Sequence, residues 1–230
     1  MYNRINTLVL TKFPLIALSL FSIFIVIGIA IYPGSTYLNN SSIGYDFFEN
    51  FLSDLGRTIT FNGETNFYSS FFFNNALCIA GLLFMTFYYF LPQYFLKENY
   101  YKISIIGSIF GILSCLCFIG TGLTPADLYL DPHIFYANKI FYFSFPATLI
   151  YSFVIIKSSR IKSLYGIGYF GFAIALISYI AILEYGPDPK ESHFSLLFQA
   201  TSQKVITIFF ILSTFMLSRG INNSLKNERT

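Results

Sequence analysis

The stretch FPLIALSLFSIFIVIGIAIYP, residues 13–33, contains no charged side chain. Because an α-helix rises about 1.5 Å per residue, roughly 20 apolar residues are enough to cross the ~30 Å hydrocarbon core of a bilayer. Five further, predominantly apolar runs of about this length follow along the chain, at about 67–91, 103–122, 134–157, 164–184 and 194–218. The sequence therefore predicts an all-α integral membrane protein in which residues 1–230 form a single domain of six transmembrane helices.

The amino-acid composition favours the same class of protein. Hydrophobic residues make up 55% of the chain and charged residues 11%, whereas about a quarter of a typical soluble domain is charged. The sequence lacks the basic cluster with interleaved aromatic residues that a nucleic-acid-binding surface needs. We therefore expect membrane lipids as partners and no nucleic acid. A homo-oligomer stays open, because 230 residues make a small membrane protein.

The distribution of charge predicts how the chain is oriented. If the six helices alternate in direction, most lysines and arginines fall on the side that holds both termini, and only Arg57 and Lys190 lie in loops on the other side. Positively charged loops stay in the cytoplasm. We therefore expect a multi-pass protein of the plasma membrane with both termini cytoplasmic. Most of the acidic residues and both histidines then lie on the outer side, which needs a separate cause, because acids contribute little to orientation.

The segment YDFFENFLSDLGRT, residues 45–58, concentrates charge in the longest connection, between the first two apolar runs. Its apolar residues recur at helical spacing, and Asn50, Ser53, Asp54 and Arg57 form a polar stripe on the opposite face. The pattern predicts a short amphipathic helix at the outer membrane interface. Two interpretations stay open: a simple interfacial strut, or a lid whose stripe, with Asp54 foremost, covers the mouth of an outward-facing polar cavity.

Two lysines, Lys139 and Lys204, fall inside predicted membrane spans. A charge near the bilayer centre costs about 2.5–3.5 kcal/mol, so such a residue usually faces the bundle interior or a water-filled cavity. Lys139 is close enough to the outer surface to reach it, whereas Lys204 is deeper. Nearby polar residues either join helices by hydrogen bonds or line a polar chamber with Lys204 at its floor. The candidate ligand-binding residues are Ser53, Arg57, Asn75, Lys139, Gln199, Gln203 and Lys204.

Two outer loops each bring acidic residues and a histidine to the start of a helix. Two histidines and a carboxylate can hold zinc with one position open for water, as in hydrolytic zinc sites. His133 and His193 are thus candidate zinc ligands, although no motif with tight ligand spacing such as H-E-x-x-H occurs. Any other cofactor is unknown. The candidate catalytic residues are Asp54, Asp127, Asp131, His133 and His193.

Two motifs resemble a known family. NFLSDLGRT, residues 50–58, and GTGLTPADLYLDPHIFYANKIFYF, residues 120–143, are similar to segments of the prokaryotic six-span membrane proteins catalogued as domain of unknown function 998. The matching positions are Ser53, Asp54, Leu55, Gly56, Gly122, Pro125, Asp127 and His133. The resemblance implies a six-helix membrane protein and supplies no activity.

Three functions fit these features. The first is a membrane-embedded hydrolase that acts on a lipid or a lipid-linked head group at the outer leaflet. The second is a non-catalytic membrane protein that binds or senses a lipid or small molecule. The third is a small transporter with Lys204 in its central site, although the sequence shows no internal repeat of the kind common in transporters. Whether the chain catalyses a reaction is left open.

Overall fold

The computed structural model describes residues 4–227 and is helical throughout its regular parts. Between these two positions the only extended pairings are two isolated bridges inside the first loop. All six α-helices are long and apolar enough to cross a membrane, which confirms the predicted number and type of elements. In chain order the helices are α1 (Arg4–Ile31), the 3-10 helix η1 (Leu52–Gly56), α2 (Phe67–Phe90), the 3-10 helix η2 (Leu91–Phe95), α3 (Tyr101–Leu123), α4 (Leu130–Lys157), α5 (Ser163–Tyr185) and α6 (His193–Asn227).

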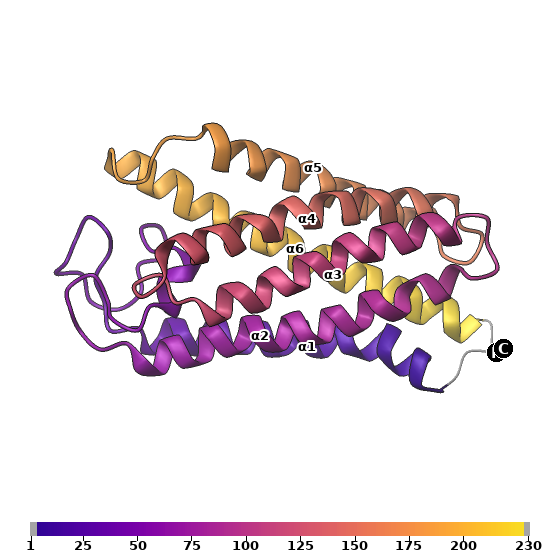
Figure 1. Ribbon diagram of the computed structural model, residues 1–230, viewed down its shortest axis with the longest axis horizontal. Coiled ribbons are helices and arrows are strands. Elements are labelled where there is room, and N and C mark those ends of the chain that lie inside the picture. The colour runs from indigo at the N-terminus through magenta and orange to yellow at the C-terminus, as the bar shows by residue number, and fades with distance from the viewer. Residues whose placement is uncertain (1–3, 228–230) are drawn as a thin grey trace.

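The six α-helices form one bundle in which the chain runs up and down (Figure 1). Each helix packs against its neighbours in the sequence, and α6 also packs against α1, which closes the ring. The end on the left of Figure 1 carries residues 32–66, and we call it the long-loop end. The opposite end carries the start of α1 and the end of α6, and we call it the termini end.

The first and last helices are longer than the apolar runs predict. The helix expected over 13–33 begins at Arg4, and the helix expected over 194–218 continues to Asn227. The other four helices begin and end within a few residues of the predicted positions. Hydropathy marks only the part of a helix that is apolar, whereas the backbone hydrogen bonds continue into polar turns beyond it.

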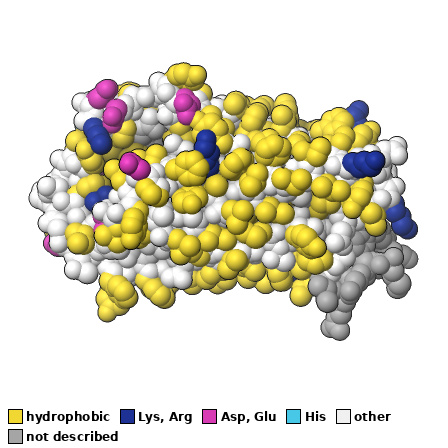
Figure 2. Space-filling view, viewed as in Figure 1, with side chains coloured by type: hydrophobic (Ala, Val, Ile, Leu, Met, Phe, Trp, Pro, Cys, Tyr) yellow, Lys and Arg dark blue, Asp and Glu magenta, His cyan; other side chains and the backbone are white. Residues whose placement is uncertain are grey.

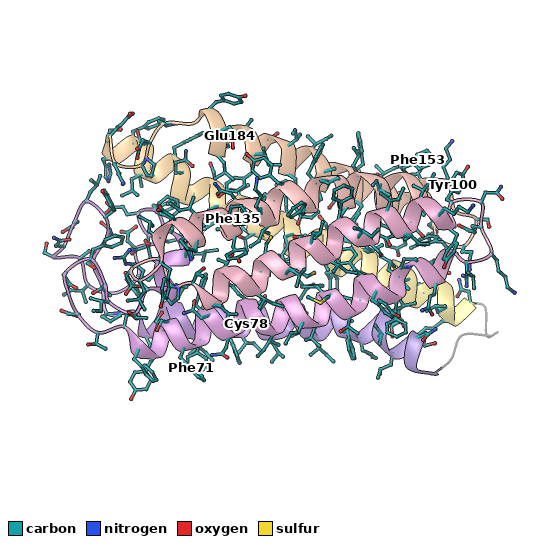
Figure 3. The ribbon with its side chains drawn as sticks, viewed as in Figure 1. Phe71, Cys78, Tyr100, Phe135, Phe153 and Glu184 are labelled. Atoms are coloured by element: carbon teal, nitrogen blue, oxygen red, sulfur yellow. The ribbon has the colours of Figure 1, made fainter. Side chains whose placement is uncertain are left out.

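Small residues bring α2 and α3 close together at the long-loop half. A Cβ atom on Gly81 would lie 2.9 Å from the Cys115 backbone oxygen, and one on Gly122 would lie 2.7 Å from the Asn74 backbone oxygen. Because backbone cannot move aside as a side chain can, only glycine fits at these two positions. Aromatic side chains pack the termini half instead, where the rings of Tyr100 and Phe153 meet edge to face at 5.5 Å (Figure 3).

The surface of the bundle divides into an apolar middle and polar ends. Figure 2 shows hydrophobic side chains over most of the length of the visible face, with acidic side chains gathered toward the long-loop end. Many large hydrophobic side chains on the helices are exposed; they include Val26, Phe71, Leu82, Ile109, Ile174 and Leu212. On this face the acidic side chains therefore gather near one end of the bundle, and those that belong to helices, such as Asp131 and Glu184, lie within the first or last turn of α4 or α5.

The segment 45–58 differs from the expected continuous amphipathic helix. The helical pattern breaks at Phe51, whose backbone is extended (φ −68°, ψ 154°), so the turn that begins at Asp46 does not continue into η1. The Asp46 Oδ1 atom caps that turn by accepting hydrogen bonds from the backbone N–H groups of Phe48 and Glu49. Only Leu52–Gly56 is helical, as the 3-10 helix η1. Asp54 is 7% exposed, so the polar stripe does not face solvent as a unit.

Candidate functional site

Lys204 of α6 is buried at the long-loop half of the bundle and fixes the loop above it. Its Nζ atom donates hydrogen bonds to the backbone oxygens of Asn50, 2.6 Å away, and Ala200, 3.0 Å away. The ammonium group also lies 5.7 Å from the ring centre of Tyr45 and 5.3 Å from that of Phe47. The side chain is 4% exposed, so these groups replace the water that would otherwise solvate the charge.

The residue before it extends this attachment. Gln203 Oε1 accepts a hydrogen bond of 2.7 Å from the backbone N–H of Leu52, the first residue of η1. Asn50 is fully buried, and its side-chain amide donates to the Ser35 backbone oxygen at 2.9 Å. Two consecutive residues of α6 therefore hold the start of η1, and Asn50 joins that point to the beginning of the loop.

Asp54 lies inside the same network. Its Oδ2 atom accepts hydrogen bonds from the Asn50 side-chain amide at 3.1 Å and from the Phe51 backbone N–H at 2.9 Å. Burial raises the pKa of the Asp54 carboxyl from 3.8 to about 6, although these two hydrogen bonds and the positive charges of Arg57 and Lys204 act in the opposite direction. The carboxyl therefore changes charge near neutral pH.

Asp127 connects the loop before α4 to the long loop. Its carboxylate accepts hydrogen bonds from the Thr58 backbone N–H at 2.9 Å, the Thr58 hydroxyl at 2.5 Å and the Ile59 backbone N–H at 3.0 Å. Partial burial acts to raise the pKa of Asp127, but these hydrogen bonds outweigh it and hold the pKa below its ordinary value. Asp127 is therefore ionised and committed to holding the residues after η1.

Side chains of α2 and of the residue before it hold the end of η1 from below. Asn66 donates from Nδ2 to the backbone oxygens of Leu55 and Arg57, and Asn74 donates from Nδ2 to that of Gly56. The sequence pattern did not single out either asparagine as a site residue. In the sequence they are only polar residues near the start of an apolar span, and nothing there indicates that they bind backbone oxygens of the long loop.

A cavity of about 90 Å³ lies beneath η1, in the centre of the ring. This is several times the space that one buried water molecule needs. Its walls are mainly Phe, Leu and Ile side chains, and all six α-helices and η1 contribute to them. The polar lining residues are Ser53, Thr121, Ser144, Gln203 and Thr207. Among the residues described, the lining includes no charged side chain, so the cavity suits an apolar or weakly polar molecule.

The two histidines have separate partners. His133 is 5% exposed, and its Nδ1 atom lies 2.7 Å from the Thr124 backbone oxygen, while its buried Nε2 atom has no hydrogen-bond partner. His193 is exposed, and its Nε2 atom lies 2.9 Å from Glu49 Oε1. Within residues 4–227 no group of three or more His, Cys, Asp or Glu side chains is placed to hold a metal ion. The zinc site stays a prediction.

The five candidate catalytic residues do not form one hydrogen-bonded group. Asp54 binds within the long loop, Asp127 binds Thr58, and each histidine has the partner described above. Asp131 is exposed at the start of α4. No hydrogen bond or ion pair joins any two of these five side chains in the described part of the chain. A catalytic role for them stays a prediction.

Of the candidate ligand-binding residues, Ser53 and Gln203 line the cavity and Lys204 holds its cover. The other four lie elsewhere. Two donate hydrogen bonds to backbone oxygens: Asn75 to that of Phe71, and Gln199 to those of Ile182 and Pro187. The other two are cations that lie over aromatic rings: Arg57 over Phe61, and Lys139 over Phe135 and Tyr142. Tyr142 also donates a hydrogen bond to Glu184, which links α4 to α5 on the side where Figure 3 labels Phe135 and Glu184.

Comparison of the chain with protein-family models, curated proteins and solved structures found no match. The resemblance of residues 50–58 and 120–143 to a six-span family therefore stays a prediction.

We predict that Lys204→Met loosens the long loop. The substitution removes two charge-assisted hydrogen bonds, each worth about 1.5–3 kcal/mol, and leaves Tyr45 as the remaining donor to the Asn50 backbone oxygen. Limited proteolysis of detergent-purified protein should cut residues 32–66 about tenfold faster than in the wild type. Lys139→Met is the control, because the described contacts of Lys139 are with two aromatic rings of α4 and not with the long loop. Equal cleavage rates in all three proteins would contradict the attachment.

We also predict that Asp54 makes stability depend on pH. Because its pKa in the folded chain, about 6, exceeds the ordinary 3.8, the folded state binds this proton more tightly than the unfolded state. The stability from this group is fully present below about pH 4 and is lost as the pH rises through about 6.

Thermal unfolding at pH 5 and pH 7 measures this effect. The Tm of the wild type should fall by a few degrees more between these two values than the Tm of Asp54→Asn, which cannot ionise. Asp131→Asn, at an exposed carboxylate, should retain the wild-type difference. If Asp54→Asn shows the full wild-type pH dependence, another group titrates.

Proposed function

We propose that the chain is a multi-pass integral protein of the plasma membrane that binds the end of a lipid hydrocarbon chain, or a small apolar molecule, inside its helix ring. The observation that carries this proposal is the central cavity, which all six α-helices line and η1 covers. A ligand there would place its apolar part among the aromatic and aliphatic walls and its polar end near Ser53 and Gln203. The cavity combines apolar walls with a few convergent polar groups, as small-molecule sites usually do. Its volume of about 90 Å³ is below the ~300 Å³ of a drug-sized site, so it suits the end of a hydrocarbon chain or a molecule of a few heavy atoms.

The exposed surface supports membrane insertion. Large hydrophobic side chains are exposed on all six α-helices, whereas a soluble monomer rarely exposes a contiguous apolar area above a few hundred Å². Phe47 and Phe48 are exposed in the turn before η1, which suits contact with the membrane interface beside the bundle. The charge distribution supports an orientation with the termini end in the cytoplasm and the long-loop end outside.

A second hollow supports a route from the bilayer. An apolar groove of about 660 Å³ runs between α5 and α6, and its lining includes the exposed Phe194 and Phe198. Ile206 lines both this groove and the central cavity. A lipid chain in the groove would therefore be one side chain away from the cavity, and movement of Ile206 would join the two spaces.

Binding has more support than hydrolysis because of how the polar groups are used. Asp54 and Asp127 accept hydrogen bonds from the loop that covers the cavity, and Lys204 donates to the same loop. These groups stabilise a cover, and a general base or nucleophile needs a free position toward a substrate. The hydrolase and transporter hypotheses have no comparable observation in their favour.

The proposed orientation predicts which loops react with a membrane-impermeant reagent. After replacement of Cys78, Cys115 and Cys117 by alanine, Ser41→Cys in the long loop should react with an impermeant maleimide on intact cells. Ser159→Cys, between α4 and α5, should react only after the membrane is opened. Both positions are exposed, so exposure does not distinguish them. The reverse pattern would show that the long-loop end faces the cytoplasm.

Filling the cavity should prevent binding. The probe is an oleate analogue with a photoreactive diazirine in its chain, and peptide mass spectrometry locates the label. In the wild type we expect label on cavity residues such as Phe210. Thr207→Phe places a ring in the cavity and should lower this labelling about tenfold. The loss of the Thr207 hydroxyl has little other effect, because it bonds only to the Gln203 backbone oxygen of its own helix.

Thr86→Phe is the matched control for this experiment. Thr86 makes the same kind of bond within α2, to the Leu82 backbone oxygen, and lines none of the cavities described above. Its labelling pattern should equal that of the wild type. Label that falls only on outward-facing residues, and equally in all three proteins, would overturn binding in the cavity.

A further inference from the structure

A polar pocket of about 280 Å³ opens at the termini end, far from the long loop. One wall comes from the α4–α5 connection and the start of α5, and the other comes from the last turns of α6. Its described lining residues are Arg160, Lys162, Tyr165, Gly220, Asn223, Ser224, Lys226 and Asn227. Three of these residues are basic and none is acidic, whereas the central cavity has no charged lining residue among those described.

The three basic residues differ in how they are held. The Arg160 guanidinium lies 4.4 Å from the ring centre of Tyr94 and donates a hydrogen bond to the Tyr94 backbone oxygen, so its charge is fixed in the wall. Lys162 and Lys226 are exposed on opposite walls. Their flexible side chains can therefore close on a ligand from both sides.

The backbone of α5 adds to the positive potential. The helix begins at Ser163, directly after Lys162, and the first N–H groups of a helix lack partners within the helix and favour an anion. The walls are close at the base of the pocket, where a Cβ atom on Gly220 would lie 2.7 Å from the Tyr165 ring. One acidic side chain described near this connection, Glu98, accepts hydrogen bonds from Ser158 and Ser159 and is not among the described lining residues of the pocket.

We propose that this pocket binds the phosphate group of an anionic phospholipid. The chemistry it recognises is a phosphate anion, held by Lys162 and Lys226 with the Asn223 amide as a further donor. The choice of a lipid depends on the proposed membrane insertion, because the pocket lies where the bundle ends and lipid phosphates are found. Basic pockets between helices on the cytoplasmic side are suited to anionic head groups.

The test is to titrate detergent-purified protein with a phospholipid and to measure the lipid-bound fraction by native mass spectrometry. Dioleoyl phosphatidylglycerol should bind more tightly than dioleoyl phosphatidylcholine, which has the same chains and no net charge. The double variant Lys162→Gln/Lys226→Gln should bind phosphatidylglycerol about tenfold more weakly than the wild type, because each lysine near the anion contributes to the binding free energy. Lys97→Gln/Lys102→Gln is the matched control, because it removes two exposed lysines from the same end that do not line the pocket.

Each alternative outcome overturns the proposal. An equal loss in the two double variants would show general attraction to the positive end of the molecule. Equal binding of the two lipids would show that the charge of the head group is not recognised. If millimolar inorganic phosphate displaces phosphatidylglycerol from the wild type, the pocket belongs to a soluble phosphate compound. Oleate labelling of the central cavity, measured on Lys162→Gln/Lys226→Gln, reports separately on the proposed function.

Discussion

The arrangement of the long-loop end depends on one buried cation. An ammonium group inside a helix bundle must exchange its water for other acceptors, and Lys204 finds one on its own helix and one on the long loop, the Asn50 backbone oxygen. A loop of 35 residues between α1 and α2 is thereby fixed at a point directly above the ring. Because η1 begins two residues after Asn50, the same contact places η1 over the cavity. η1 thereby closes the space inside the helix ring at this end.

The backbone N–H groups of the long loop give a reason for acidic residues to gather at the long-loop end. A long loop without strands leaves many backbone N–H groups unpaired, and carboxylates are strong acceptors for them. Asp46 accepts from two N–H groups in the turn before η1, Asp127 accepts from two after it, and Asp188 accepts from Lys190 in the α5–α6 connection. The short connections at the termini end need fewer acceptors. The asymmetry therefore has a structural cause that needs no catalytic site.

Hydropathy was sufficient to predict the six helices because the length and apolar character of each run are properties of the sequence itself. The same kind of reasoning was wrong for residues 45–58, although their apolar residues have helical spacing. The segment divides there at Phe51, whose backbone is extended. Asp46 caps the turn before Phe51, and Asp54 accepts a hydrogen bond from the Phe51 N–H at the start of η1. Periodicity records which face of a segment is apolar, and it does not record which residues end a helix.

The site was less predictable than the fold for a related reason. The sequence indicated that Lys204, inside an apolar span, must find polar partners, and that Asn50 and Asp54 belong to one cluster. The decisive partners are backbone oxygens and N–H groups of the long loop, and these groups are the same in every residue, so no sequence pattern marks them. Residues such as Asn66, which hold η1 through its backbone oxygens, become identifiable only when the path of the loop is known. A polar residue beside an apolar span is therefore better evidence of an attachment point than of a reaction centre.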